Sequence, residues 1–205
     1  MTAQIELYGA NTGNSLRAAI ALSEVQIPYT VRKLDLSAAE HHDPTYLSLN
    51  PAGKVPTLVD LSATPKVVIN QSNAIIQYAD AQVPNHLAPQ QSGPDRYLVY
   101  DRYFYFVTDV IANSHAAFFL RRNGLHEAAV KMEERAIENM IRGESFLTNG
   151  YMAGASFSMA DIAAFTWAVS VQKQLPWGEL PQMKRWYEMI ASRPGIQKGM
   201  ASFQE

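Results

Sequence analysis

The hydrophobic pattern changes character near residue 83, and this change constrains the fold more than any other feature of the chain. Before it, short runs with the two-residue alternation of β-strands are interleaved with runs at helical spacing. The order is β-α-β, a linking helix, then β-β-α, over residues 5–8, 15–25, 29–36, 44–49, 57–61, 66–69 and 71–81. This order predicts a four-stranded mixed sheet covered by helices.

The second part of the chain contains only helical patterns. A polar stretch punctuated by Pro84, Pro89 and Pro94 is typical of a linker, and strand-like alternation does not return after it. Helices are predicted over residues 95–122, 125–147, 159–171 and 182–191. The third of these is apolar almost throughout, so we expect it to be buried. The predicted division is an α/β domain over 1–82, a linker over 83–93 and an all-α domain over 94–205.

Composition excludes several classes of function. The 205 residues are 47% hydrophobic and 18% charged, which indicates a globular chain. Seventeen Lys and Arg against nineteen Asp and Glu give a net charge of −2, without the basic stripe of a nucleic-acid-binding protein. The absence of cysteine excludes disulfide scaffolds, cysteine-ligated zinc and a cysteine nucleophile. The N-terminus does not resemble a signal peptide and no apolar run approaches the roughly 20 residues that span a bilayer, so a cytoplasmic protein is expected.

A capping motif marks the start of the predicted helix over 159–171. Ser158 stands at the N-cap and Asp161 follows three residues later, while Phe157 and Ile162 can form a hydrophobic staple. We expect this motif to serve folding alone, with a contribution of about 1–2 kcal/mol.

Several motifs, taken together, resemble the glutathione S-transferase superfamily. In chain order they are NPAGKVP at 50–56, the strand TLVD at 57–60, QSNAI at 71–75, SMADI at 158–162 and RPGIQ at 193–197. The resemblance spans the whole chain. It implies a thioredoxin-like N-terminal domain, an all-helical C-terminal domain and a cytoplasmic, homodimeric enzyme of detoxification. Glutathione would be the co-substrate, with no other cofactor and no metal.

The resemblance also implies a set of glutathione-binding residues, namely His41, Lys54, Val55, Pro56, Gln71 and Ser72. Val55, before a cis Pro56, would pair its backbone N–H and C=O with the cysteinyl backbone of glutathione. Ser72, at a helix start, would hold the γ-glutamyl carboxylate with help from Gln71. For Lys54 and His41, a contact to the glycyl carboxylate and a solvated surface position both stay open.

The turn after the first strand, YGANTGNSLR at 8–17, occupies the place where this superfamily stabilises the glutathione thiolate. Thr12-Gly13-Asn14 resembles the Thr-Pro-Asn of the bacterial nu class, in which the Thr hydroxyl and the Asn amide face the sulfur. Here Gly13 replaces the proline, and the usual Glu of the second motif is a glutamine. Thr12 with Asn14 ranks first as the catalytic pair, Ser15 second and Tyr8 third. Asn14 and Ser15 are equally plausible as helix caps.

Three functions follow from the resemblance. The first is a glutathione transferase that activates the thiol for attack on small hydrophobic electrophiles held between the domains, against the aromatic helix over 95–122. The second is a glutathione-dependent disulfide reductase or peroxidase of nu-class type, with two glutathione molecules as the thiols because the protein has none. The third is a non-catalytic binding protein. The intact Val55-Pro56 and Gln71-Ser72 pairs argue against the third.

Overall fold

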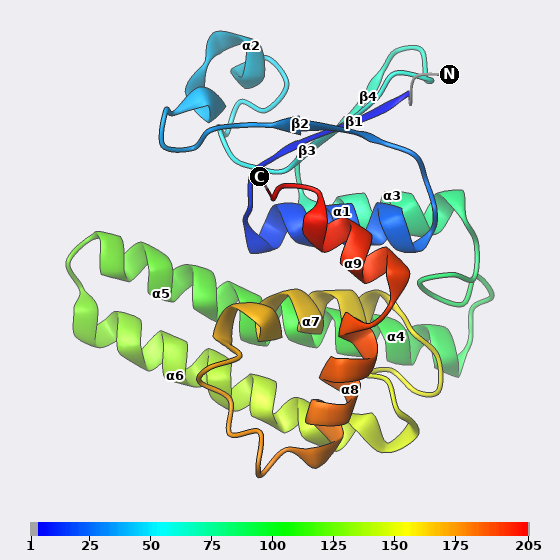
Figure 1. The fold of residues 1–205 in the computed structure, drawn as a ribbon, viewed down its shortest axis with the longest axis vertical. Coiled ribbons are helices and arrows are strands. Elements are labelled where there is room, and N and C mark those ends of the chain that lie inside the picture. Colours follow the sequence, from blue (N-terminus) through cyan, green and yellow to red (C-terminus); the bar gives the residue numbers. More distant parts are fainter. Residues whose placement is uncertain (1–3, 205) are drawn as a thin grey trace. The chain divides into compact units, whose positions relative to one another are not determined.

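The computed structural model describes residues 4–204, which fold into two compact units (Figure 1). The first unit combines the chain up to Pro84 with the segment that begins at Ser192. The second unit runs from Asn85 to Ala191.

The first unit contains the predicted four-stranded mixed sheet. Its strands are β1 (Ile5–Gly9), β2 (Thr30–Lys33), β3 (Thr57–Asp60) and β4 (Val67–Ile69), in the spatial order β2-β1-β3-β4. β1 is parallel to β2 and antiparallel to β3, and β3 is antiparallel to β4. Tyr8 of β1 is paired with Thr57 of β3. The end of β1 and the start of β3 therefore meet at the same edge of the sheet.

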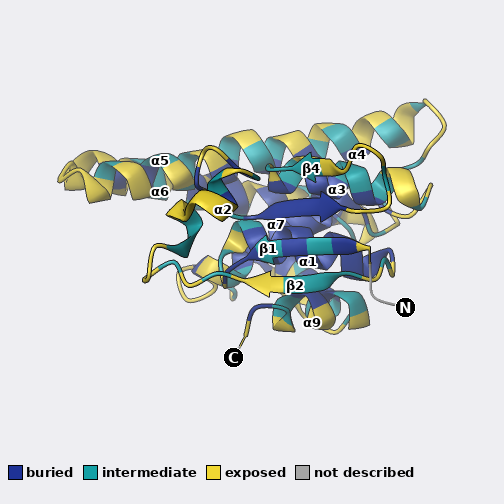
Figure 2. Ribbon diagram, turned by 90° about the horizontal axis from the view of Figure 1, so that it is seen from above, coloured by how far each residue is buried: buried dark blue, intermediate teal, exposed yellow. Residues whose placement is uncertain are grey.

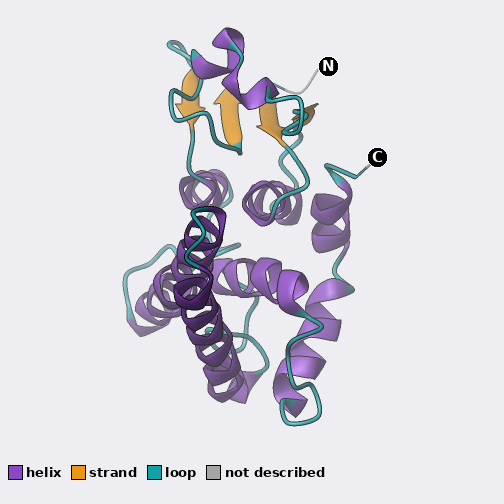
Figure 3. Ribbon diagram, turned by 90° about the vertical axis from the view of Figure 1, so that its left-hand side faces the viewer, coloured by secondary structure: helices purple, strands orange, loops and turns teal. Residues whose placement is uncertain are grey.

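Helices cover both faces of this sheet. They are α1 (Gly13–Glu24), the 3-10 turn η1 (Glu40–His42), α2 (Pro44–Leu47), α3 (Ser72–Gln82) and α9 (Pro194–Ala201). α3, α1 and α9 lie in a row on one face, and α2 lies on the other (Figures 1 and 3). This is the predicted thioredoxin-like arrangement, with α1 at the centre of the helical layer.

Side-chain alternation in β1 explains why the sheet is covered in this way. Ile5, Leu7 and Gly9 are buried on one face, whereas Glu6 and Tyr8 are half-buried on the other. The central strands β1 and β3 are the most buried and the edge strands are more exposed (Figure 2). Burial of the apolar face against the helical layer is the main stabilisation of this unit.

The last helix departs from the predicted division, which assigned residues 94–205 to the helical domain. α9 packs along α1 in the first unit instead. A Cβ atom on Gly199 would lie 2.5 Å from the Cα of Ile20, so only glycine permits this approach. Arg193 adds an ion pair to the nearly buried Glu24, with 2.6 Å between Nη2 and Oε2. These contacts join segments about 170 residues apart, as the sequence separation of the ion pair shows.

The second unit is entirely helical. Its elements are α4 (Pro94–Tyr105), the π-helical segment η2 (Phe106–Ile111), α5 (Ala112–Arg122), α6 (His126–Arg142), the 3-10 segment η3 (Gly143–Asn149), α7 (Met159–Val171) and α8 (Pro181–Ala191). The helix predicted over 95–122 is thus interrupted by a π-helical segment. α7 is buried along almost its whole length, as predicted, because α4, α6 and α8 all pack against it. None of the helices within residues 4–204 is long and apolar enough to cross a membrane.

Part of the predicted linker, residues 83–93, is packed into the second unit. Leu87 is fully buried, and its carbonyl accepts a hydrogen bond of 2.9 Å from the Met159 N–H. The sequence pattern indicated only a polar stretch broken by proline. The buried leucine within it therefore anchors the chain at the start of α7.

The capping motif before α7 is a buried hydrogen-bond centre. Both carboxylate oxygens of Asp161 accept hydrogen bonds, from the Ser158 N–H and hydroxyl at 2.9 and 3.0 Å and from the Met152 N–H at 2.9 Å. The Trp186 indole N–H adds a fourth at 2.8 Å. Asp161 is fully buried, so these donors replace the water that its carboxylate would otherwise bind.

Replacing Ser158 with Ala tests this centre. The variant removes the hydroxyl donor from a buried carboxylate, so the free energy of unfolding should fall by about 1–2 kcal/mol. Ser156→Ala is the matched control, because Ser156 lies in the same loop and is exposed. Urea denaturation followed by circular dichroism measures both. Equal stability of the two variants would contradict the assigned role of Ser158.

Candidate functional site

The turn between β1 and α1 holds a pair of hydroxyl groups. Thr12 is the N-cap of α1, with φ −128° and ψ 151°, and its Oγ1 accepts the Ser15 N–H at 3.3 Å. The two hydroxyl oxygens, Thr12 Oγ1 and Ser15 Oγ, are 3.0 Å apart. Ser15 is fully buried, whereas Thr12 is half-buried. The turn thus places Thr12 at the surface and Ser15 beneath it.

Hydrogen-bond accounting fixes the direction of the bond between these hydroxyls. Ser15 Oγ already accepts the Ala10 N–H at 3.4 Å, and Thr12 Oγ1 is the only acceptor that its hydroxyl reaches among residues 4–204. A buried hydroxyl that donates to nothing would cost about 1–3 kcal/mol, so Ser15 donates to Thr12. Thr12 Oγ1 therefore accepts from both the N–H and the hydroxyl of Ser15. Its own hydrogen remains for a group outside the turn.

Tyr8 is directed away from this role by its neighbours on the strand. Its hydroxyl donates to Glu6 Oε2 at 2.9 Å, and Glu6 also forms an ion pair with Arg32 at 2.6 Å. Burial raises the pKa of the Tyr8 hydroxyl, and the Glu6 carboxylate raises it further. The phenolic hydrogen is thus committed to a carboxylate on the same strand.

A buried arginine links the first turns of α1 and α3. Arg17 Nη1 donates to Asn14 Oδ1 at 2.9 Å and to Ser72 Oγ at 3.1 Å. Arg17 is 3% exposed and Ser72 is 6% exposed. Because Asn14 Oδ1 accepts from Arg17, the amide N–H groups of Asn14 are the ones left to donate. The positive guanidinium also lies at the start of α3, where the first-turn N–H groups already favour an anion.

Sequence reasoning did not single out Arg17, although a signal was present. In the helix predicted over 15–25, Arg17 is the first charged residue, and no other follows it before Glu24. It follows Asn14 by three residues, and this spacing places the two side chains on the same helical face. The contact to Ser72 spans 55 residues and could not be read from local spacing.

The loop before β3 is held by a network around one carbonyl. Lys54 C=O accepts hydrogen bonds of 2.6 Å from both the Tyr46 hydroxyl and the Asn50 side-chain amide. The Val55–Pro56 peptide bond that follows is cis, as the resemblance implied. Val55 is half-buried, and its N–H and C=O have no hydrogen-bond partner among residues 4–204. The N–H and C=O of Val55 are therefore available to a ligand.

His41, Lys54 and Gln71 lie in segments around this loop. His41 is half-buried in η1, with its ring centroid 4.0 Å from that of His42, and its Nδ1 is buried without a partner among the described residues. Gly53 has a φ of +57°, and a Cβ there would lie 2.8 Å from His42 Nδ1, so η1 closely approaches the loop. Lys54 and Gln71 are exposed, and the Gln71 side chain does not cap α3.

The sheet brings these groups to one edge. Pairing of Tyr8 with Thr57 places the end of β1 beside the residue that follows Pro56. Arg17 then joins the start of α1 to the start of α3. Of the predicted residues, Thr12 and Ser15 are bonded to each other, Asn14 and Ser72 are each bonded to Arg17, and Lys54, Val55 and Pro56 form the adjacent loop. This edge offers hydroxyl and amide donors, an unpaired backbone segment and a positive helix start.

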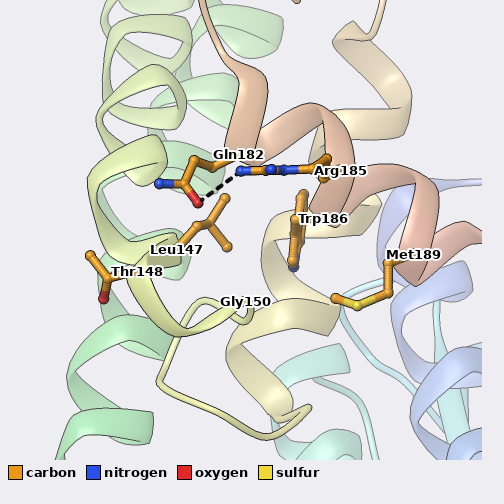
Figure 4. A pocket seen from close by; sticks show the side chains of 7 residues that line it. All are labelled: Leu147, Thr148, Gly150, Gln182, Arg185, Trp186 and Met189. Carbon is orange, nitrogen blue, oxygen red and sulfur yellow. Dashed lines mark hydrogen bonds between the residues drawn. The ribbon is translucent and has the colours of Figure 1, made fainter.

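One cavity of the second unit does not contain comparable chemistry. It has a volume of about 220 Å³, lies between η3 and α8 and is lined by Leu147, Thr148, Gly150, Gln182, Arg185, Trp186 and Met189 (Figure 4). Arg185 donates to Gln182 within it at 3.4 Å. The lining contains no carboxylate and no histidine, so it lacks an acid–base pair. No cluster of His, Asp and Glu that could hold a metal ion occurs in the described part of the chain.

Comparison with known proteins identifies the family. Residues 3–81 match the model of the glutathione S-transferase N-terminal domain, and residues 107–194 match that of the C-terminal domain. The chain therefore belongs to the glutathione S-transferase superfamily.

Individual relatives agree with this assignment. The chain is 29% identical to glutathione S-transferase 3 of Zea mays, over 98% of this chain and 95% of the relative. It is 24% identical to the disulfide-bond oxidoreductase YfcG of Escherichia coli, over 98% and 96% of the two chains. A crystal structure of a Burkholderia graminis glutathione transferase with two glutathione molecules bound per subunit has the same fold. Its TM-score is 0.86 at 20% identity, over 99% of this chain and 90% of that one.

Proposed function

We propose that this protein is a glutathione transferase that binds glutathione at the edge of its sheet and activates the thiol through Thr12. The observation that carries the proposal is the accounting at Thr12 Oγ1. By this accounting Ser15 donates to Thr12 Oγ1 through both its N–H and its hydroxyl, so the Thr12 hydrogen is the part of the group that can act toward a ligand. A donor of this kind stabilises a thiolate more than a thiol.

The remaining site residues support binding of the peptide. The unpaired N–H and C=O of Val55 suit the cysteinyl backbone of glutathione, in the manner of an added strand. The start of α3, with Ser72 and the adjacent Arg17 guanidinium, suits the γ-glutamyl carboxylate, and the exposed Gln71 amide can add a donor. The exposed Lys54 suits the glycyl carboxylate, and His41 lies in η1, which closely approaches the same loop at Gly53.

The energy required is small enough for one hydroxyl to supply. A free thiol with a pKa of about 8.5 is only a few per cent ionised at neutral pH. Lowering that pKa by about 1.5 units requires about 2 kcal/mol. A hydrogen bond to a charged acceptor supplies about 1.5–3 kcal/mol. The start of α1 adds about 0.3–1 kcal/mol.

The reaction then needs no further group from the protein to form the bond. The thiol proton leaves to solvent, and the thiolate sulfur attacks an electrophilic carbon of a small hydrophobic compound. A carbon–sulfur bond forms while a leaving group departs with its electron pair, or while a conjugated double bond takes up the electrons and then a proton. The N–H groups of Asn14 can share the negative charge of the sulfur before attack.

The variant Thr12→Val tests thiol activation. It keeps the shape of the side chain and removes the donor, so the pKa of bound glutathione should rise by about 1–2 units. Turnover at neutral pH should fall roughly ten- to hundredfold, while the affinity for glutathione changes little. Thiolate absorbance of the complex against pH and calorimetric titration give the two quantities. Loss of the cap should also cost about 1 kcal/mol of stability, which leaves the protein folded.

Three further variants make the result specific. Thr12→Ser keeps the hydroxyl and should behave as wild type, and Tyr8→Phe should leave the pKa of the bound thiol unchanged. Ser72→Ala should show the opposite split, with affinity weakened by about 1–3 kcal/mol and an unchanged thiol pKa. A pKa shift in Tyr8→Phe without one in Thr12→Val would overturn the assignment of Thr12.

A second candidate function is glutathione-dependent disulfide reduction. It is favoured by similarity to the oxidoreductase YfcG and by the two glutathione molecules in the Burkholderia graminis structure. This chain contains no cysteine, so both thiols of such a reaction would come from glutathione. One glutathione thiolate would attack the disulfide and release a thiol, and the second would displace the remaining thiol to give oxidised glutathione.

A turnover panel distinguishes these activities. The substrates are an aryl halide, an organic hydroperoxide and hydroxyethyl disulfide, each with glutathione and with Thr12→Val as the inactive control. We expect conjugation of the aryl halide. Reduction of the disulfide or hydroperoxide without conjugation would favour the second candidate. Glutathione binding with no turnover of any substrate would identify a non-catalytic binding protein.

The proposal includes a homodimer formed through the helical unit. Large apolar side chains are exposed on α5, on α6 and on the turn between them, which Figure 2 shows as a largely exposed hairpin. We call this surface the apolar tip, and it comprises Phe118, Phe119, Leu125 and Val130, with exposed fractions of 46–64%. Exposed apolar side chains grouped on one hairpin are typical of association sites.

Sedimentation tests the homodimer. The monomer mass is 22.8 kDa, and we expect the wild type to sediment at about twice this mass at micromolar concentration. Replacing both Phe118 and Phe119 with Ser should shift the protein toward the monomer, because it removes most of the aromatic area from the apolar tip. A wild-type protein that sediments as a monomer would exclude the homodimer.

A further inference from the structure

The chain's C-terminal end lies against the turn that carries Thr12. Phe203 is 1% exposed, and a Cβ built on Gly9 would lie 2.7 Å from its Cζ atom. The same Cβ would lie 2.9 Å from Ser15 Oγ. The Phe203 ring and the Ser15 hydroxyl therefore both border the space that the missing side chain of Gly9 leaves open. Phe203, almost 190 positions after Ser15 in the sequence, thus completes the packing around the buried Ser15 hydroxyl.

Through its side chain, Ser15 connects the packing of Phe203 to Thr12. Its hydroxyl and its N–H both bond Thr12 Oγ1, and its oxygen accepts the Ala10 N–H. The two bonds of the hydroxyl group require one rotamer of Ser15. If the Phe203 ring were removed, the empty volume would let the Ser15 side chain rotate or would admit water, because the ring is the nearest group to a Cβ built on Gly9. Thr12 would then lose the donor that directs its own hydrogen outward.

The C-terminal segment is held on α1 by contacts distributed along its length. At its start, Arg193 pairs with Glu24. In its middle, Gly199 approaches the backbone of Ile20. At its end, the Ser202 hydroxyl lies 2.7 Å from the Tyr29 hydroxyl. The position of Phe203 is thus set by the whole segment from Ser192 onward and not by local chain geometry.

We propose that Phe203 is a positioning residue for thiol activation: by closing the space beside Gly9, it holds Ser15 in the rotamer that directs the Thr12 hydroxyl toward the ligand. The inference rests on the proposed function, because it concerns the same hydroxyl. It assigns to the C-terminal segment a part in the chemistry of the first unit. Phe203 itself touches neither the thiol nor the peptide in this scheme.

The test measures the pKa of bound glutathione and the affinity for glutathione separately. Phe203→Ala should raise the pKa of the bound thiol by about half a unit to one unit and lower neutral-pH turnover roughly three- to tenfold. The dissociation constant of glutathione should stay within about twofold, because Val55 and Ser72 are untouched. Phe203→Leu fills most of the volume and should restore wild-type values. If Phe203→Ala does not fold, Phe203→Val replaces it with the same expected direction.

Two controls separate positioning from general destabilisation. Ser202→Ala removes one of the several contacts that hold the segment and leaves the Phe203 ring in the space beside Ser15, so the thiol pKa should not move. In a Ser15→Ala background, Phe203→Ala should add no further shift, because the group through which it acts is gone.

The outcomes distinguish this inference from the proposed function. A wild-type protein that leaves the pKa of bound glutathione at its free value refutes both. A wild-type protein that lowers this pKa, with a folded Phe203→Ala or Phe203→Val variant that lowers it equally, refutes the positioning role alone. Additive shifts in the Ser15→Ala, Phe203→Ala pair would show that Phe203 acts by another route, and would also refute it.

Discussion

Burial of α1 is the constraint on which the site depends. The helix is enclosed by the sheet, by α3 and by α9, and its residues from Ser15 to Glu24 are all buried. A helix held on so many sides cannot shift along its axis without breaking several packed surfaces at once. Its first turn therefore occupies one position relative to β1. The N-terminal hydroxyls of the helix are preorganised in the way that electrostatic stabilisation of a charged sulfur requires.

The same constraint explains why a polar cluster is tolerated at the end of a buried helix. The first N–H groups of α1 and α3 lack partners within their own helices. Thr12 satisfies one of them, and Arg17 bonds the side chains at both helix starts. A buried guanidinium is costly unless it is hydrogen-bonded, and a bound carboxylate beside it would lower that cost further. The arrangement thus favours an anionic ligand at the place where the proposed γ-glutamyl contact lies.

Local patterns predicted the strands, most of the helices and the order of the two units, because alternation and helical spacing record which face of each element is buried. They did not predict what depends on distant contacts. The helix over 194–201 was not predicted, and only the close approach of Gly199 to Ile20 and the Arg193–Glu24 pair reveal that this segment packs on α1 in the first unit. The bond of Arg17 to Ser72 depends on a distant contact in the same way. The ranking of Thr12, Ser15 and Tyr8 likewise could not be decided from spacing, because it depends on which hydroxyl hydrogens are already committed.

Helix capping and thiol activation make different demands on one hydroxyl, and the Thr12 geometry lets both be met. Capping uses the lone pairs of Oγ1, which accept the N–H of Ser15 and its hydroxyl hydrogen. Activation uses the hydrogen on the same oxygen. Because the two roles use different parts of the group, occupying the lone pairs does not weaken the donor. Occupying the lone pairs strengthens the hydroxyl as a donor, because a hydroxyl group whose oxygen accepts hydrogen bonds is polarised. Thr12, predicted from the sequence as the thiolate donor, is also the N-cap of α1, and its hydrogen bonds as a cap are suited to polarise the hydroxyl that we propose faces the sulfur.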